Sequence, residues 1–157
     1  MHRVSLTCGL AVACLAAADA KFEIENGALK TPAVVFKTGS AVLQNADDAA
    51  VALAAAYLTE KTSVSTLRIE AHVQHGVKDA QTLTRQRALA VARALIAKGV
   101  DCKRLIAVGF GDSKPASESA AENNRVLFVN AALRGHAIGG MPLDGGGEVA
   151  GDLCTSH

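Results

Sequence analysis

The chain has few aromatic side chains, with four phenylalanines, one tyrosine and no tryptophan among 157 residues. A nucleic-acid surface built on base stacking needs more rings than this, and no block of basic residues is present. An excess of one charge is also missing, because 16 Lys and Arg face 15 Asp and Glu, a formal net charge of +1. Since half of the residues are hydrophobic, the near-neutral chain does not fit the disordered class either.

Long apolar runs are absent outside the N-terminus, which excludes a polytopic membrane protein. What the sequence has instead is alanine, at 31 positions, so that much of its hydrophobic content consists of small side chains. The length allows one domain with a modest core. Composition therefore indicates one globular domain and leaves its function open.

The N-terminus resembles a bacterial secretory signal. His2 and Arg3 begin it, an apolar run covers residues 4–17, and Ala18-Asp19-Ala20 is a small-x-small cleavage site. The run is short for a membrane-spanning helix. We therefore predict a signal peptide at residues 1–20 and export of the chain.

A lipobox is the alternative interpretation of the same segment. Residues 11–14 read Ala-Val-Ala-Cys, and Cys14 would then carry a lipid and begin the mature chain. Ala11 stands where such motifs usually have a large aliphatic residue, so we favour simple cleavage. Contact with a membrane is expected only if Cys14 is lipidated.

Cleavage after Ala20 would leave two cysteines, Cys102 and Cys154. An even pair in an oxidising compartment favours a disulfide, which would attach the C-terminal segment to the domain. Two free thiols are the alternative. A catalytic cysteine is not expected, because no histidine stands in a recognisable partner motif.

Hydrophobic periodicity predicts strands and helices in alternation after a polar lead-in at residues 21–32. The β-branched or alternating segments predict strands at 33–36, 65–73, 105–108 and 125–129. Two segments without internal Gly or Pro predict helices. Residues 45–60 are rich in alanine, and residues 79–98 have apolar side chains at helical spacing. The order is that of an α/β sandwich, β-α-β-α-β-β, with helices packed on one mixed sheet.

The ends of these elements carry their own signals. Ser40 is expected to cap the first helix, Asp79 to cap the second, and Gly99 to end it. Residues 115–122 indicate a loop with a helical turn. The glycines that follow Arg134 favour a flexible tail over residues 134–157.

Four motifs follow one another between residues 34 and 129. They comprise, in order, Phe36, Ser40 and Leu43; Leu83, Thr84, Arg87, Ala88, Val91 and Leu95; Gly99, Val100, Arg104, Leu105, Gly109, Gly111 and Pro115; and Asn123, Asn124, Arg125 and Val126. Their order and spacing resemble the OmpA-like C-terminal domain, which occurs in outer-membrane OmpA proteins, the peptidoglycan-associated lipoprotein and the MotB stator. The resemblance implies an OmpA-like domain at residues 33–133.

The family binds peptidoglycan non-covalently, at the zwitterionic diaminopimelate of the stem peptide, with an acid and a base. The resemblance places the base at Arg87, whose planar fork can hold a carboxylate through two hydrogen bonds. The resemblance also places Thr84 and Arg125 among the peptidoglycan-binding residues, with a structural role, bonding loop carbonyls beside the last strand, as the favoured alternative for Arg125. The family's acid turn, Gly-His-Thr-Asp, is here residues 71–74, Ala-His-Val-Gln, so Gln74 replaces the aspartate.

This departure leaves two functions open. Loss of a charge-assisted hydrogen bond weakens binding about ten- to a hundredfold, so the first is weakened peptidoglycan binding by an exported protein. The second is a structural or protein-interaction module of an envelope complex that has lost the ligand. Either places the protein in the periplasm or cell envelope of a Gram-negative bacterium. The segment from Gln74 to Arg87 is also shorter than in the family, and Asn124 replaces an arginine.

An enzyme is not expected, because the sequence offers no nucleophile with an adjacent base and no paired catalytic carboxylates. No cofactor is predicted. His72 and His75 are too few for a zinc site and have no acid or cysteine at ligand spacing, so no metal is predicted. Nucleic acid is not an expected partner.

Overall fold

The computed structural model describes residues 22–138 and 145–155. The predicted signal peptide and the alternative lipidation site, Cys14, lie outside the described residues. Within them, none of the helices combines the length and the apolar character that a membrane crossing requires.

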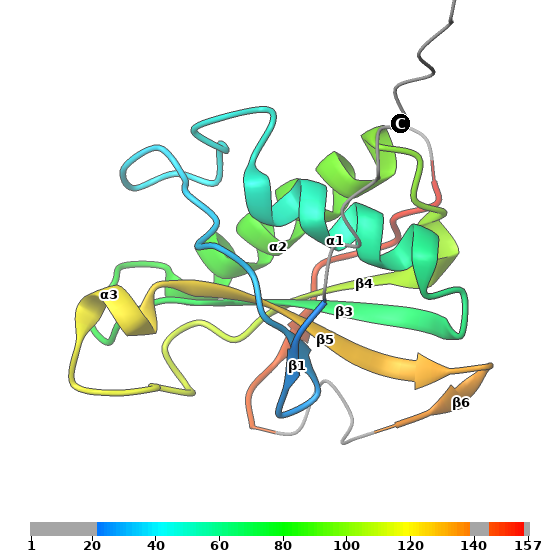
Figure 1. Cartoon of the computed structure of the whole chain (residues 1–157). Helices are drawn as coiled ribbons and strands as arrows, with labels where there is room; N and C mark the ends of the chain where they lie inside the picture. The colour runs from blue at the N-terminus through cyan, green and yellow to red at the C-terminus, as the bar shows by residue number, and fades with distance from the viewer. Residues whose placement is uncertain (1–21, 139–144, 156–157) are drawn as a thin grey trace, which may run out of the picture.

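Two long helices, α1 (Ala49–Glu60) and α2 (Ala80–Ala97), cover one face of the sheet (Figure 1). The strands are β1 (Ile24–Glu25), β2 (Ala28–Leu29), β3 (Val64–His72), β4 (Leu105–Gly109), β5 (Arg125–Leu133), β6 (His136–Ala137) and β7 (Glu148–Val149). A 3-10 turn, η1 (Cys102–Arg104), precedes β4, and a short helix, α3 (Ala120–Asn123), precedes β5.

The sheet is mixed, with the order β1-β2-β5-β3-β4-β7, and β6 pairs with β5. β3 and β4 run parallel, while β5 is antiparallel to β3 and to β2. The predicted α/β sandwich, with helices on one face of a mixed sheet, is confirmed.

Successive side chains of β3 point alternately to the two faces of the sheet. Leu67, Ile69 and Ala71 are fully buried in the core with the helices, and Arg68 and Glu70 therefore point to the opposite face. Small side chains on the helices, Ala50 and Ala54 on α1 and Ala88 and Ala92 on α2, are also fully buried. The abundant alanine thus lets the helices pack closely onto the sheet.

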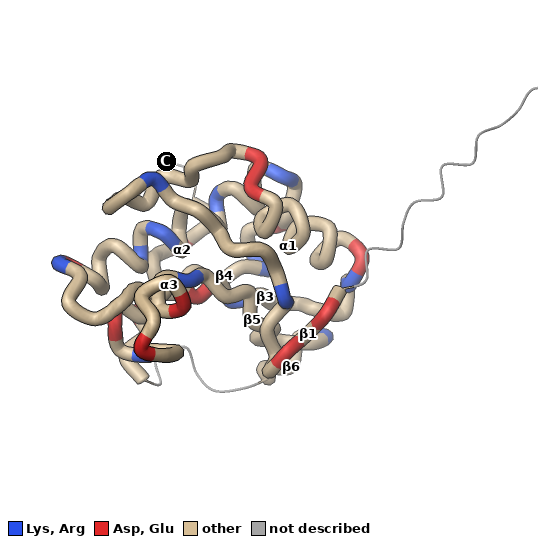
Figure 2. Tube along the Cα trace, turned by 60° about the vertical axis from the view of Figure 1, so that its left-hand side comes forward, with Lys and Arg blue, Asp and Glu red and all other residues tan. Residues whose placement is uncertain are grey.

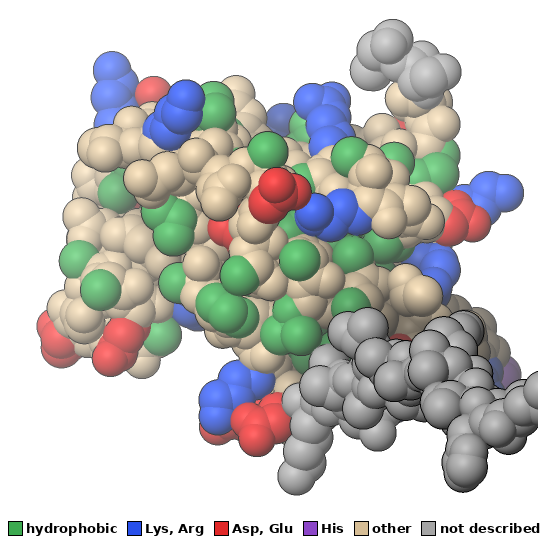
Figure 3. All heavy atoms as spheres, turned by 45° about the horizontal axis from the view of Figure 1, so that its top comes forward, with side chains coloured by type: hydrophobic (Ala, Val, Ile, Leu, Met, Phe, Trp, Pro, Cys, Tyr) green, Lys and Arg blue, Asp and Glu red, His purple; other side chains and the backbone are tan. Residues whose placement is uncertain are grey.

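Charged residues of both signs are interspersed along the described chain, and neither sign collects on one face (Figure 2). From the helix side, hydrophobic side chains form small separate patches among polar ones (Figure 3). On the helix side, the visible surface of the described residues therefore shows no broad apolar face.

Two predictions for residues 33–48 are wrong. Residues 33–36 form no strand, because β2 already pairs with β5 at Val129 and Phe128, and only an isolated bridge joins Phe36 to Leu43. Ser40 does not cap the first helix. Asp48 caps it, since its Oδ1 accepts hydrogen bonds from the amides of Ala50 and Val51 at 2.9 and 3.2 Å.

The prediction of a flexible tail is also wrong for its described part. β6 pairs with β5, β7 pairs with β4, and the amide of Ala150 donates to the Ala107 carbonyl at 2.8 Å. Cys154 forms the expected disulfide with Cys102, across 52 residues of sequence. Strand pairing and the disulfide hold this segment against the domain despite its glycine-rich composition.

Candidate functional site

Arg87 lies half-buried on α2, beside the loop of residues 35–44. Its Nε donates to the Ser40 carbonyl at 2.9 Å, and its guanidinium carbon lies 4.8 Å from the centroid of the Phe36 ring. Burial lowers the pKa of Arg87 from its ordinary value, but a guanidinium stays protonated at neutral pH. No carboxylate among the described residues forms an ion pair with it.

The loop beside Arg87 is a small hairpin. The amide of Lys37 donates to the Val42 carbonyl at 2.8 Å, and that of Gln44 to the Val35 carbonyl at 2.9 Å. Phe36 and Leu43 pack against the core, and Gly39 adopts a positive φ of 66° in the turn. The first sequence motif thus anchors the loop with its two apolar residues and presents the Ser40 carbonyl to Arg87.

Gln74 lies half-buried just after β3. Its backbone amide donates to the side-chain oxygen of Asn124 at 3.2 Å, while the Asn124 amide nitrogen donates to the Ala120 carbonyl. No hydrogen bond within the described residues joins the Gln74 side chain to Arg87. Asn124 therefore positions the turn at Gln74, a role that the sequence alone did not reveal.

Thr84 is part of the packing of the domain. Its side chain is fully buried, and its hydroxyl bonds to the Ala80 carbonyl at 2.9 Å and accepts from the Gly111 amide at 2.9 Å. These bonds give Thr84 a packing role, and its part in ligand binding stays a prediction.

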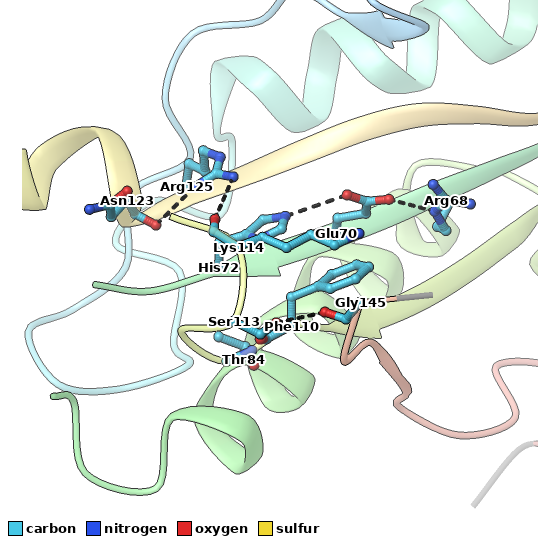
Figure 4. A network of polar contacts seen from close by, with 11 residues as sticks. Arg68, Glu70, His72, Thr84, Phe110, Ser113, Lys114, Asn123, Arg125 and Gly145 are labelled. Atoms are coloured by element: carbon cyan, nitrogen blue, oxygen red, sulfur yellow. Dashed lines mark hydrogen bonds and ion pairs between the residues drawn. The ribbon is translucent and has the colours of Figure 1, made fainter. Parts of the chain in front are cut away.

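Arg125 begins β5 and is bound to loop carbonyls (Figure 4). Its Nη2 donates to the carbonyl of Lys114 at 3.1 Å and its Nη1 reaches that of Asn123 at 3.5 Å. Burial lowers the pKa of Arg125, and the charge of Glu70 opposes this. Within the described residues, Arg125 and Arg87 share no hydrogen-bond partner.

A polar network runs along β3 on the face opposite the helices (Figure 4). Arg68 Nε lies 2.6 Å from one oxygen of Glu70, and His72 Nε2 lies 3.4 Å from the other. His72 is 2% exposed and stacks on Phe110 with ring centroids 4.9 Å apart. Neither ring nitrogen of His72 makes a hydrogen bond within the described residues, and its contact with Glu70 is an ion pair only when the ring is protonated.

The two buried groups of this network both have lowered pKa values. Burial lowers the pKa of His72, Glu70 opposes this, and Arg125 and Lys114 add to it. Burial by itself would raise the pKa of Glu70, but His72 and Arg68 together bring it below its usual value. Among the described residues, no three His, Cys, Asp or Glu side chains are grouped so as to hold a metal ion.

The comparisons with known proteins identify a family and a fold. A model of the OmpA family matches residues 35–127. The peptidoglycan-associated lipoprotein of Burkholderia pseudomallei is 27% identical with a TM-score of 0.54, over 62% of this chain and 87% of that one. An outer membrane protein of Borrelia burgdorferi B31 is 25% identical with a TM-score of 0.54, over 70% and 95%.

A more distant structure shows the same fold. The periplasmic domain of Helicobacter pylori MotB has a TM-score of 0.58 at 17% identity, over 71% of this chain and 82% of that one. Among curated proteins, none matches the chain.

Proposed function

Because this chain belongs to the OmpA family, we propose that it binds the peptidoglycan stem peptide through Arg87, as an exported module of the cell envelope. One of the similar structures is a peptidoglycan-associated lipoprotein, which supports this ligand. The role is non-covalent binding, without catalysis, metal or cofactor.

The state of Arg87 carries the proposal. Its Nε is fixed on the Ser40 carbonyl and its plane lies over Phe36, while no carboxylate of the described chain neutralises it. A guanidinium held in this way loses little further conformational freedom when it binds a carboxylate. The diaminopimelate carboxylate is the anion that we assign to it.

Binding of the neighbouring ammonium is weakened. Gln74 can accept a hydrogen bond from the ammonium, but it lacks the charge of the aspartate found in the family. Loss of the charge-assisted hydrogen bond lowers the affinity about ten- to a hundredfold. This same observation favours the second candidate, a structural or protein-interaction module that retains the fold without the ligand.

The proposed location is the periplasm or another part of the envelope of a Gram-negative bacterium. The disulfide between Cys102 and Cys154 supports an oxidising compartment. The names of the similar structures, a lipoprotein and an outer membrane protein, are consistent with the envelope. Attachment to a membrane would require the lipidation of Cys14.

Co-sedimentation with purified peptidoglycan sacculi tests the proposal. We expect the protein to pellet with sacculi and Arg87→Gln to lose at least about tenfold in affinity. Arg93→Gln is the matched control, since Arg93 is exposed on the same helix and forms no hydrogen bond or ion pair within the described residues.

Two results would separate the alternatives. If the protein does not pellet but Gln74→Asp does, the chain has kept the scaffold and lost the ligand. If binding persists unchanged in Arg87→Gln, Arg87 is not the binding residue.

A further inference from the structure

A groove of about 640 Å³ lies apart from Arg87, along the sheet face that carries Arg68 and Glu70. Its floor includes Leu127 and Val129 of β5, which alternate with the core residues Val126 and Phe128. One wall is formed by residues 25–34, from β1 to the segment after β2, and the other by α3 and Lys114.

The charges at the α3 end of this groove do not balance. Arg68 and Glu70 form an ion pair with each other. Lys114 and Arg125, which also line the groove, form no ion pair within the described residues. The Lys114 ammonium lies 4.3 Å from the centroid of the Phe110 ring, and Arg125 is bound only to loop carbonyls.

Two further acidic side chains line the groove, Glu25 on β1 and Glu122 on α3, the latter at the same end as Lys114 and Arg125. Glu25 and Glu122 are both exposed, so that solvent and salt screen their charges. Lys114 is exposed as well, whereas Arg125 is half-buried and its charge is less screened. The groove therefore has a cationic end next to an apolar floor.

We propose that this groove binds a small organic anion, in which one carboxylate or phosphate group is attached to a short apolar chain. The acidic group would lie at Lys114 and Arg125, and the chain would lie along Leu127 and Val129. Ligand pockets of this size commonly combine an apolar lining with a few polar groups that fix the orientation.

The groove contains neither Arg87 nor Gln74, although Arg125 at its cationic end occupies a position of the family's motifs. Arg87 lies beside the loop of residues 35–44 and is not part of the lining. The wall at residues 25–34 also precedes the segment matched by the family model, which begins at residue 35. The proposal therefore does not depend on the function proposed for Arg87.

Titration of the isotope-labelled protein with octanoate, followed by amide chemical shifts in NMR, tests the site. We expect saturable shifts in residues 127–129, and 1-octanol, the uncharged analogue, to bind about tenfold more weakly. Inorganic phosphate alone should also bind more weakly, because it cannot use the apolar floor. Equal binding of octanoate and octanol, or no saturable shift at residues 127–129, would overturn the proposal.

Octanoate binding by two lysine variants tests whether Lys114 holds the carboxylate. Lys114→Gln should weaken octanoate binding about tenfold. Lys103→Gln, an exposed lysine in η1 outside the lining, should leave it unchanged. If Lys114→Gln fails to fold, the comparison of octanoate with octanol on the unaltered protein still decides the question.

Two further measurements exclude other sources of binding. Arg87→Gln should bind octanoate normally, and loss of binding in that variant would place the ligand at the other site and overturn the proposal. Binding to phosphatidylglycerol vesicles without any binding of monomeric octanoate would likewise overturn it, in favour of a membrane surface.

Discussion

The hydroxyl of Thr84 and the backbone amide of Gly111 are joined by a hydrogen bond of 2.9 Å in the interior of the domain. This bond fixes the first turns of α2 against the chain that leaves β4. The contact is close, because a Cβ added at Gly109 would lie 2.4 Å from the backbone nitrogen of Arg85. Arg87 follows Thr84 by one turn, so this packing also fixes the helix that carries the candidate binding residue.

Replacing Thr84 by valine should destabilise the fold by about 1–3 kcal/mol. Valine keeps the shape of the side chain but leaves the buried Gly111 amide without its acceptor. The free energy of unfolding in urea measures the effect. Thr84→Ser, which retains the hydroxyl, should cost less, and equal stabilities of the valine and serine variants would contradict the assigned role of the hydroxyl.

Reduction of the disulfide should release the segment that contains β7. The loop-entropy model assigns about 4 kcal/mol to a cross-link over 52 residues, an upper figure because β6 and β7 also hold the segment. Unfolding of Cys154→Ser in urea measures the loss, with a matched Cys102→Ser variant as control. The Ala150 amide, which donates to Ala107, should exchange its hydrogen faster in both variants.

The stability of the domain should fall as the pH falls. The pKa values of His72 and Glu70 are lower in the folded chain than their usual 6.5 and 4.5, so the unfolded chain binds more protons. The loss from His72 begins below about pH 6.5, with a slope of at most about 1.4 kcal/mol per pH unit, and that from Glu70 below about pH 4.5.

His72→Phe should flatten the part of this profile that lies between about pH 7 and 5. Phenylalanine keeps a ring stacked on Phe110 and removes the proton-binding group. Urea unfolding at several pH values measures the profile. His136→Gln is the control, because His136 is exposed on β6. An unchanged slope in His72→Phe would show that another group causes the pH dependence.

Restoring the family's acid at residue 74 should strengthen peptidoglycan binding. Gln74→Asp returns a negative charge opposite the diaminopimelate ammonium, and we expect a gain of about ten- to a hundredfold in co-sedimentation with sacculi. The gain should depend on Arg87, so the double variant with Arg87→Gln is the control. A gain of the same size without Arg87 would indicate nonspecific attraction and contradict the two-residue site.

Much of the fold could be predicted from local patterns. β3 and α2 were predicted within two residues of their ends, because alternation and a helical stripe are visible in the sequence itself. Asp79 occupies the N-cap position of α2, yet its φ is 52° and its side chain makes no capping bond. Such details depend on how the chain approaches the helix, which local preference does not determine.

The errors have a common physical origin. Residues 33–36 favour a strand, but β2 occupies the place beside β5 that they would need. Residues 134–157 have the composition of a flexible segment, but the pairing of β7 with β4 and the disulfide supply stabilising contacts from distant residues. Which segment pairs with the edge of a sheet depends on residues that are far apart in the chain. A short stretch of sequence therefore cannot predict it.

Residue type and spacing are enough to predict the alternation of helices and strands and to find the OmpA-like motifs. They also reveal that Gln74 replaces the family's aspartate. The contacts of the motif residues, in contrast, become visible in the packed fold. Thr84 is buried and bonded to Gly111, whereas Arg87 is fixed by Ser40 and Phe36 and has no carboxylate partner within the described residues. The reason is that burial and hydrogen-bond partners come from segments far away in the chain, and the groove between residues 25–34 and α3 exists only after those segments have packed.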